Sequence, residues 1–127
     1  MHEVLQAPGL VFTENDAVIP DLVWASNERL ANGMDNSGHF VVAPELIVEV
    51  LSADIENEQR DKTAKLKLYS RYGVQEYWIA NWRLKSIEVY QRQDAQLQQV
   101  KVLFMGDTLT SPLFPEFECS IGGLFIQ

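Results

Sequence analysis

The stretch PELIVEVLS, residues 44–52, sets a full negative charge, Glu49, inside the most apolar segment of the chain. A continuous apolar run of this length, with β-branched residues, is typical of a strand covered on both faces. Because side chains alternate across a strand, Ile47 and Glu49 share one face, and Val48 and Val50 share the other. An unpaired buried carboxylate costs several kcal/mol. Glu49 therefore belongs to a buried ion pair, to a strand end that reaches solvent, or to a functional site.

The segment that follows, ENEQRDKTAKLKLYSRYGV (residues 56–74), predicts the main helix, with Gly73 placed where a C-terminal cap belongs. At about 100° per residue, Asp61 and Lys65 fall within the apolar stripe that must face the sheet. A solvated charge run would not put two charged residues there. An i,i+4 ion pair between Asp61 and Lys65 is the simpler explanation of these two charges, but it leaves Glu49 unexplained.

The remaining segments predict strands around this unit. Apolar and β-branched runs indicate a strand in each of six stretches: residues 9–15, 16–26, 45–52, 75–82, 86–92 and 96–104. The last three form a meander, with turns near Leu84–Lys85 and Gln93–Ala95, and short strands and a final helical turn follow it. This order predicts an α/β (α+β) fold, in which one mixed β-sheet carries one main helix packed on it.

Length and composition limit the functions that the chain can have. Its 127 residues predict a single domain, 1–127. One cysteine, Cys119, excludes an internal disulfide and fits the cytoplasm, and no apolar run is long enough to span a membrane.

A net charge of −8 argues against a broad nucleic-acid-binding surface. Half of the ten basic residues nevertheless lie in the predicted helix, so a polyanion contact would be centred there: Arg60, Lys62, Lys65, Lys67 and Arg71. Solvated helix charges are the simpler reading of this basic flank.

A third charged residue, Asp21 in VIPDLVWAS, lies at the mouth of an expected strand, where a Pro-Asp pair is also common turn chemistry. Asp21, Glu49 and Lys65 come from three separate segments, and each is a charge at an otherwise apolar position. Two neighbouring carboxylates repel unless a cation lies between them. Hard oxygen ligands suit Mg²⁺ or Mn²⁺, and a nearby lysine suits a transition state that gathers negative charge.

Four segments carry a resemblance to a known family: IPDLVWAS, PELIVEVLS, RDKTAKLKLYSRYGVQEYWIAN and SIEVYQR. In this order they resemble the Uma-two family of restriction endonucleases, within the PD-(D/E)xK nuclease superfamily. The resemblance runs from Gly9 to the C-terminus. It implies a restriction-endonuclease-like core, a mixed sheet flanked by helices.

The resemblance also implies roles for individual residues. Asp21 matches the motif aspartate and Glu49 the acidic residue of the (D/E)xK element. The superfamily lysine would stand at Leu51, but in this family it appears in the following helix, where Lys65 matches it. Three further residues match recurring positions of the family: Asp61, Tyr69 and Glu76. Members usually carry an N-terminal helical region, which the sequence begins too late to include.

These features together predict a metal-dependent endonuclease that hydrolyses DNA phosphodiester bonds. Asp21 and Glu49, with the Val50 carbonyl, would hold Mg²⁺ or Mn²⁺, and Lys65 would complete the catalytic set. Arg60 and Lys62 are the candidate nucleic-acid contacts. Without the N-terminal helices, one sheet face should expose apolar side chains, so we expect a homodimer and weak activity.

Two alternatives remain open. The chain could be an inactive relative that serves as an oligomerisation or binding module. It could also be an α+β domain whose charges form only structural pairs, and this last reading predicts Glu49 paired with a lysine or arginine and no gap for a metal.

Overall fold

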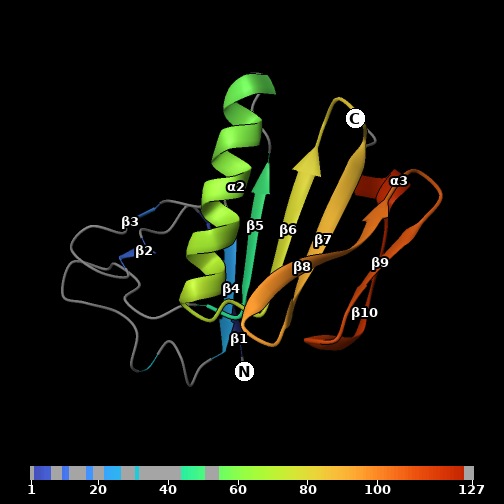
Figure 1. Ribbon diagram of the computed structural model, residues 1–127. Helices are drawn as coiled ribbons and strands as arrows, with labels where there is room; N and C mark the ends of the chain where they lie inside the picture. The colour runs from blue at the N-terminus through green and yellow to red at the C-terminus, as the bar shows by residue number, and fades with distance from the viewer. Residues whose placement is uncertain are drawn as a thin grey trace.

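The computed structural model describes residues 2–6, 10–11, 17–18, 22–26, 31, 44–50 and 55–124 of the chain (Figure 1). The elements in these ranges are, in chain order, β1 (His2–Gln6), β2 (Leu10–Val11), β3 (Ala17–Val18), β4 (Leu22–Ser26), β5 (Leu46–Val50), α2 (Ile55–Arg71), β6 (Glu76–Asn81), β7 (Ser86–Gln93), β8 (Gln96–Leu103), β9 (Thr108–Ser111), β10 (Phe114–Ser120) and α3 (Ile121–Leu124). Among the described residues, no helix combines the length and apolar character needed to cross a membrane.

Six of the described strands form one sheet in the order β1-β4-β5-β6-β7-β8. β5 and β6 are parallel and are joined through α2, whereas the other neighbouring pairs are antiparallel. A parallel pair needs a long crossover connection, and an α-helix is the usual one. The predicted mixed sheet with one main helix is therefore confirmed, as is the meander β6-β7-β8.

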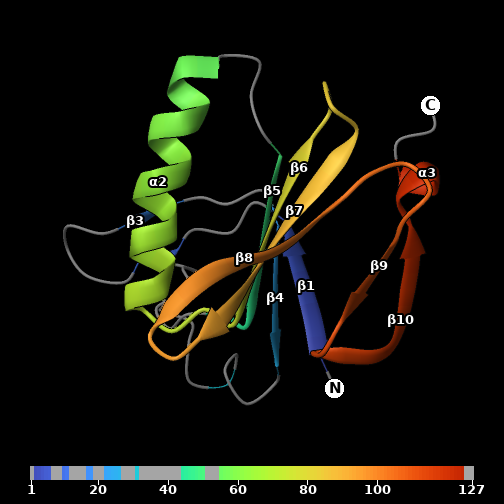
Figure 2. The ribbon, with the colours of Figure 1, turned by 45° about the vertical axis from the view of Figure 1, so that its right-hand side comes forward.

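The sheet lies between α2 and the β9–β10 hairpin, as Figure 2 shows. The helix-side core is the buried cluster that packs with α2: Val23, Ala25, Ile47, Tyr69, Val74, Tyr77, Ile79, Tyr90 and Leu97. The hairpin-side core lies on the other face: Trp24, Leu46, Trp78, Ile87, Val89, Leu103, Leu109 and Ile121. Neighbouring residues of β5 and β6 alternate between the two cores, as the pleat of a strand requires.

The helix ends where the sequence predicts. Gly73 has a φ of 90°, in the left-handed region that glycine adopts without steric cost. The N–H of Val74 donates to the carbonyl of Tyr69 at 3.1 Å, which is the long bond of a Schellman cap. Val74 is fully buried in the helix-side core, so the cap also directs the chain into β6.

Candidate active site

Glu49 is buried on the helix side of the sheet, with 6% of its surface exposed. It lies one residue before the end of β5, and Ile47 on the same face belongs to the helix-side core. The predicted strand with a carboxylate among apolar neighbours is therefore confirmed over Leu46–Val50, whereas residues 51–52 of the predicted stretch lie outside the described residues.

Two side chains compensate the charge of Glu49. The Nζ of Lys65 donates to Oε1 at 2.6 Å, and the hydroxyl of Tyr77 donates to Oε2 in a short hydrogen bond. Lys65 reaches the carboxylate from α2, whereas Tyr77 stands on the neighbouring strand β6, opposite Ile47. Each carboxylate oxygen thus has one protein donor. Lys65 lies on the sheet-facing side of α2, as the helical stripe predicts.

A second group of the same composition lies on the same face. The Nζ of Lys62 lies 3.1 Å from Oε1 of Glu88, and the hydroxyl of Tyr90 donates to the same oxygen at 2.6 Å. Burial, followed by the hydrogen bond to Glu88, raises the pKa of Tyr90 well above its usual range. The Tyr90 hydroxyl therefore stays protonated and remains a donor.

Strand register relates the two groups. Glu49 pairs with Ile79, and Ile79 pairs with Glu88, so the two carboxylates occupy one row across β5, β6 and β7. Two strand spacings of about 4.8 Å separate their backbones. The rings of Tyr77 and Tyr90 occupy the next row, with centroids 6.0 Å apart.

Three of the other predicted site residues cannot be placed relative to Glu49. Asp21 lies outside the described residues, and so do the side chains of Arg60 and Asp61. The register of β4 with β5 is nevertheless described up to the pair Leu22 and Val48, which are the sequence neighbours of Asp21 and Glu49.

Glu76 belongs to the opposite face of the sheet. It is 1% exposed, accepts from Trp78 Nε1 at 3.0 Å and accepts from Ser111 Oγ at 2.5 Å. Ser111 belongs to β9, so this carboxylate joins the hairpin to the sheet. A structural hydrogen bond is therefore its observed role, and it does not touch Glu49.

The metal-ligating side chains among the described residues supply only part of a site for a hard cation. No group of three or more His, Cys, Asp or Glu side chains that could hold a metal ion occurs among the described residues. Glu49 supplies oxygen ligands, and an ionised carboxylate has about four lone-pair sites, of which the described donors Lys65 and Tyr77 use two. Mg²⁺ keeps several waters and takes one or two carboxylates, so one further acidic residue would complete a site.

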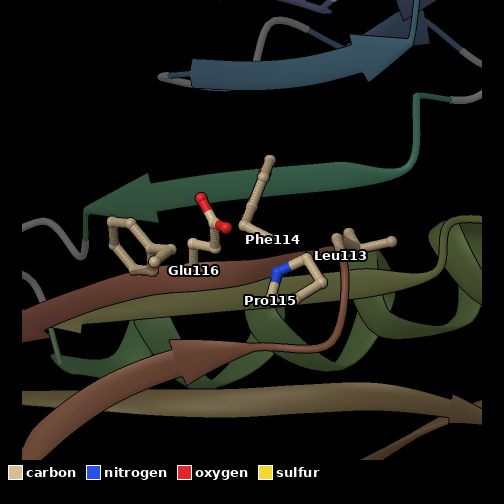
Figure 3. A pocket seen from close by; sticks show the side chains of 5 residues that line it. Leu113, Phe114, Pro115 and Glu116 are labelled. Atoms are coloured by element: carbon tan, nitrogen blue, oxygen red, sulfur yellow. The ribbon is translucent and has the colours of Figure 1, made fainter.

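A shallow, open hollow of about 390 Å³ lies on the hairpin. Figure 3 shows its lining, in which Glu116 is the charged member: Leu113, Phe114, Pro115, Glu116 and Phe117. Phe114 and Phe117 pack against Trp24 and Trp78 of the hairpin-side core. This hollow therefore belongs to the face opposite Glu49 and Lys65.

Sequence reasoning missed Tyr77, Glu88 and Tyr90. Each stands in a predicted strand, where an aromatic residue usually indicates a core position and a charge that alternates with apolar residues usually indicates a solvent-facing position. The spacing of Lys62 and Lys65, one helical turn apart, is the signal that could have suggested two partners on the facing sheet.

Comparison with known proteins agrees with this architecture. A family model described as “Putative restriction endonuclease”, Uma2, matches residues 3–122. Among solved structures, the chain is similar to a “putative nuclease belonging to DUF820” from Anabaena variabilis ATCC 29413, with 21% sequence identity and a TM-score of 0.76. The match covers 98% of this chain and 68% of that chain, and at this identity it shows the fold. No match was found among curated proteins. Since the family model spans almost the whole sequence, the chain belongs to the Uma2 family.

Proposed function

We propose that this protein is a metal-dependent endonuclease that hydrolyses the phosphodiester bonds of DNA. The family description supports nuclease activity. The observation that carries the proposal is the buried carboxylate of Glu49, held by Lys65 and Tyr77 near the carboxyl end of β5.

Asp21 is the proposed second carboxylate. Consecutive Cα atoms are about 3.8 Å apart, so Asp21 must lie next to Leu22, whose partner in the ladder is Val48. One further step of this register would pair Asp21 with Glu49. Val23 faces the helix-side core, and strand alternation would direct Asp21 to the same side. This argument supports Asp21 and Glu49, with the Val50 carbonyl, as ligands of Mg²⁺ or Mn²⁺.

The proposed reaction is hydrolysis. The oxygen of water forms a bond to phosphorus, the bond from phosphorus to one ester oxygen breaks, and that oxygen takes up a proton. A bound divalent cation would supply Lewis-acid polarisation of the phosphate and lower the pKa of water. Lys65 places a positive charge 2.6 Å from Glu49, where the phosphate would gather negative charge in the transition state.

The proposal also covers phosphate contacts, domain organisation, oligomeric state and cellular location. Lys62, which pairs with Glu88 on the same face of the sheet and is partly exposed, is proposed with Arg60 to contact neighbouring phosphates. We also propose that residues 1–127 act as one domain, that the protein forms a homodimer, and that it is cytoplasmic, in keeping with its single cysteine.

One observation favours the alternative reading. The ion pair between Glu49 and Lys65 satisfies the carboxylate without a metal, as expected for a structural pair or for an inactive binding module. The pair alone therefore does not distinguish an endonuclease from an inactive binding module. A measurement of metal binding is needed to distinguish them.

Calorimetry with Mn²⁺ and a plasmid-nicking assay test the proposal. We expect the wild type to bind Mn²⁺ and to nick DNA weakly, since the acidic surface disfavours the approach of DNA. Asp21→Asn and Glu49→Gln should each abolish Mn²⁺ binding. Lys65→Ala should retain metal binding but lose nicking, with thermal unfolding used to confirm that it folds, because it leaves a buried charge unpaired.

Glu88→Gln is the matched control, because Glu88 also has one lysine and one tyrosine partner, Lys62 and Tyr90, on the same face of the sheet. Its Mn²⁺ affinity should equal that of the wild type. If Glu88→Gln abolishes binding as Glu49→Gln does, the assigned site is wrong. If the wild type binds no metal at millimolar concentration, the binding-module reading replaces the enzyme.

A further inference from the structure

The turn between β6 and β7 exposes an aromatic residue and two cations close to the candidate site. Its four residues are all exposed: Trp82, Arg83, Leu84 and Lys85. Trp82 is 45% exposed and Leu84 is 65% exposed. Trp82 lies outside the buried core, because β6 ends at Asn81, before this residue.

The shape of this turn is fixed by its own bonds. The side chain of Asn81 is buried and accepts the N–H of Leu84 at 3.1 Å. Asn81 and Ser86 close the ladder below the turn, and Lys85 adopts a φ of 50°. A turn that is already ordered loses less conformational entropy when a ligand binds to it.

The turn lies at the same end of the sheet as Glu49. β5 and β6 are parallel, and Ile79, the partner of Glu49, precedes Trp82 by three residues. Three extended residues span about 10 Å, which is about three nucleotides at the rise of one DNA strand. Figure 1 shows the turn between β6 and β7 at the same end of the molecule as the end of β5 and the N-terminal end of α2.

The charge of the turn contrasts with that of the whole chain. Arg83 and Lys85 carry two positive charges with no acidic residue in the segment 82–87, whereas the chain carries −8. An exposed indole followed by two cations suits a ligand that offers both a flat base and phosphates. Duplex DNA keeps its bases stacked, so the ligand class is an unpaired nucleotide.

We infer that the β6–β7 turn is a binding site for unpaired nucleotides of the DNA strand that enters the candidate active site. A base stacks on Trp82, and Arg83 and Lys85 contact the flanking phosphates. This inference rests on the proposed nuclease function for its location, but base binding itself needs neither metal nor hydrolysis.

Intrinsic fluorescence offers a direct test. The chain has three tryptophans, all of them described, and Trp24 and Trp78 are only 7% and 8% exposed. The solvent-exposed part of the emission therefore reports on Trp82. In EDTA, we expect a thymidine oligonucleotide of about twelve nucleotides to quench this emission. An abasic oligonucleotide of the same length, with the same phosphates, should not quench it.

Variants separate stacking from charge. Trp82→Leu keeps an apolar side chain but removes the ring, and should bind the thymidine oligonucleotide about tenfold more weakly, the factor that corresponds to roughly 1.4 kcal/mol of stacking. Trp82→Phe should retain most of the affinity. Arg83→Ala should weaken the binding of both oligonucleotides. Lys101→Ala, a partly exposed cation on β8, is its control and should weaken neither.

Equal wild-type affinity for the two oligonucleotides, or unchanged thymidine binding by Trp82→Leu, would overturn the inference. So would the absence of any binding of the thymidine oligonucleotide. Because the titration contains no metal, these results are independent of Mn²⁺ calorimetry on Glu49→Gln, and either proposal can fail without the other.

Discussion

At the scale of single residues, two hydrogen-bond donors stabilise the charge of Glu49 within its apolar strand. Lys65 neutralises Glu49, and Tyr77 fixes its second oxygen. Removing one partner of a buried ion pair typically costs about 3–5 kcal/mol. The orientation of the carboxylate therefore depends on Tyr77 as well as on the more obvious lysine.

Tyr77→Phe tests this role. The change removes one hydroxyl from a buried ring, so we expect the free energy of unfolding to fall by about 1.5–3 kcal/mol, the usual contribution of a hydrogen bond to a charged group. Because Glu49 would lose its fixed orientation, Mn²⁺ affinity should fall by about 10- to 100-fold. Urea unfolding and calorimetry measure the two quantities.

Tyr90→Phe is the matched control, since it removes the same hydroxyl from the donor to Glu88. It should lower stability but leave the Mn²⁺ affinity unchanged. Equal losses of metal affinity in the two variants would show that the effect is general loosening of the helix-side core.

At the scale of elements, the β9–β10 hairpin is joined to the sheet through a buried carboxylate without a cationic partner among the described residues. Glu76 on β6 accepts from Ser111 on β9 and from Trp78 on its own strand. A buried acceptor that loses a donor pays a desolvation cost, which is larger when the acceptor is charged. The attachment of the hairpin should therefore be sensitive to Ser111.

Ser111→Ala should lower the free energy of unfolding by about 2–3 kcal/mol, because it removes one of the donors to Glu76. Thr110→Ala, an exposed change on the same strand, should stay within about 0.5 kcal/mol of the wild type. Mn²⁺ binding should be unchanged in both variants, since Glu76 and Glu49 face opposite sides of the sheet. A stability of Ser111→Ala equal to that of Thr110→Ala would contradict this role.

The elements from Leu46 onward could be predicted from the sequence, because their signals are local, whereas the edge strand β1 was not predicted. Apolar runs located β5, β6, β7 and β8, and Gly73 located the end of α2. The partners could not be predicted in the same way. Tyr77 reaches Glu49 only because β5 and β6 pair in one particular register, and Lys62 reaches Glu88 across the width of the sheet. Such contacts depend on tertiary geometry, which no local pattern encodes.

At the scale of the whole molecule, the described apolar side chains that remain exposed lie mostly at turns and strand ends. Both faces of the central described strands contribute to a buried core. Among the residues whose burial the structure describes, the most exposed large apolar ones are Val50, Trp82, Leu84, Val100, Phe104 and Met105. Phe104 and Met105 are neighbours in the turn between β8 and β9, so they form an exposed apolar patch outside the candidate site.

We expect the protein to self-associate through this patch, since contiguous exposed apolar surface generally marks an interface. Light scattering at micromolar concentration should give the mass of a dimer, and the double variant Phe104→Ser, Met105→Ser should give that of a monomer. A wild type that runs as a monomer throughout the micromolar range would refute this expectation.

The alternation of β6 also limits which changes in chain length the protein can accept. Glu76 serves the hairpin side and Tyr77, the next residue, serves the helix side. Inserting or deleting one residue before this pair would exchange their faces, so the phenol would leave the site and the carboxylate would lose the hairpin in the same event. The exposed residues Asp94 and Ala95, in the turn between β7 and β8, do not contribute to the two buried cores in this way. Additions to the chain are therefore compatible with the fold at that turn, whereas β6 admits substitutions but no change in length.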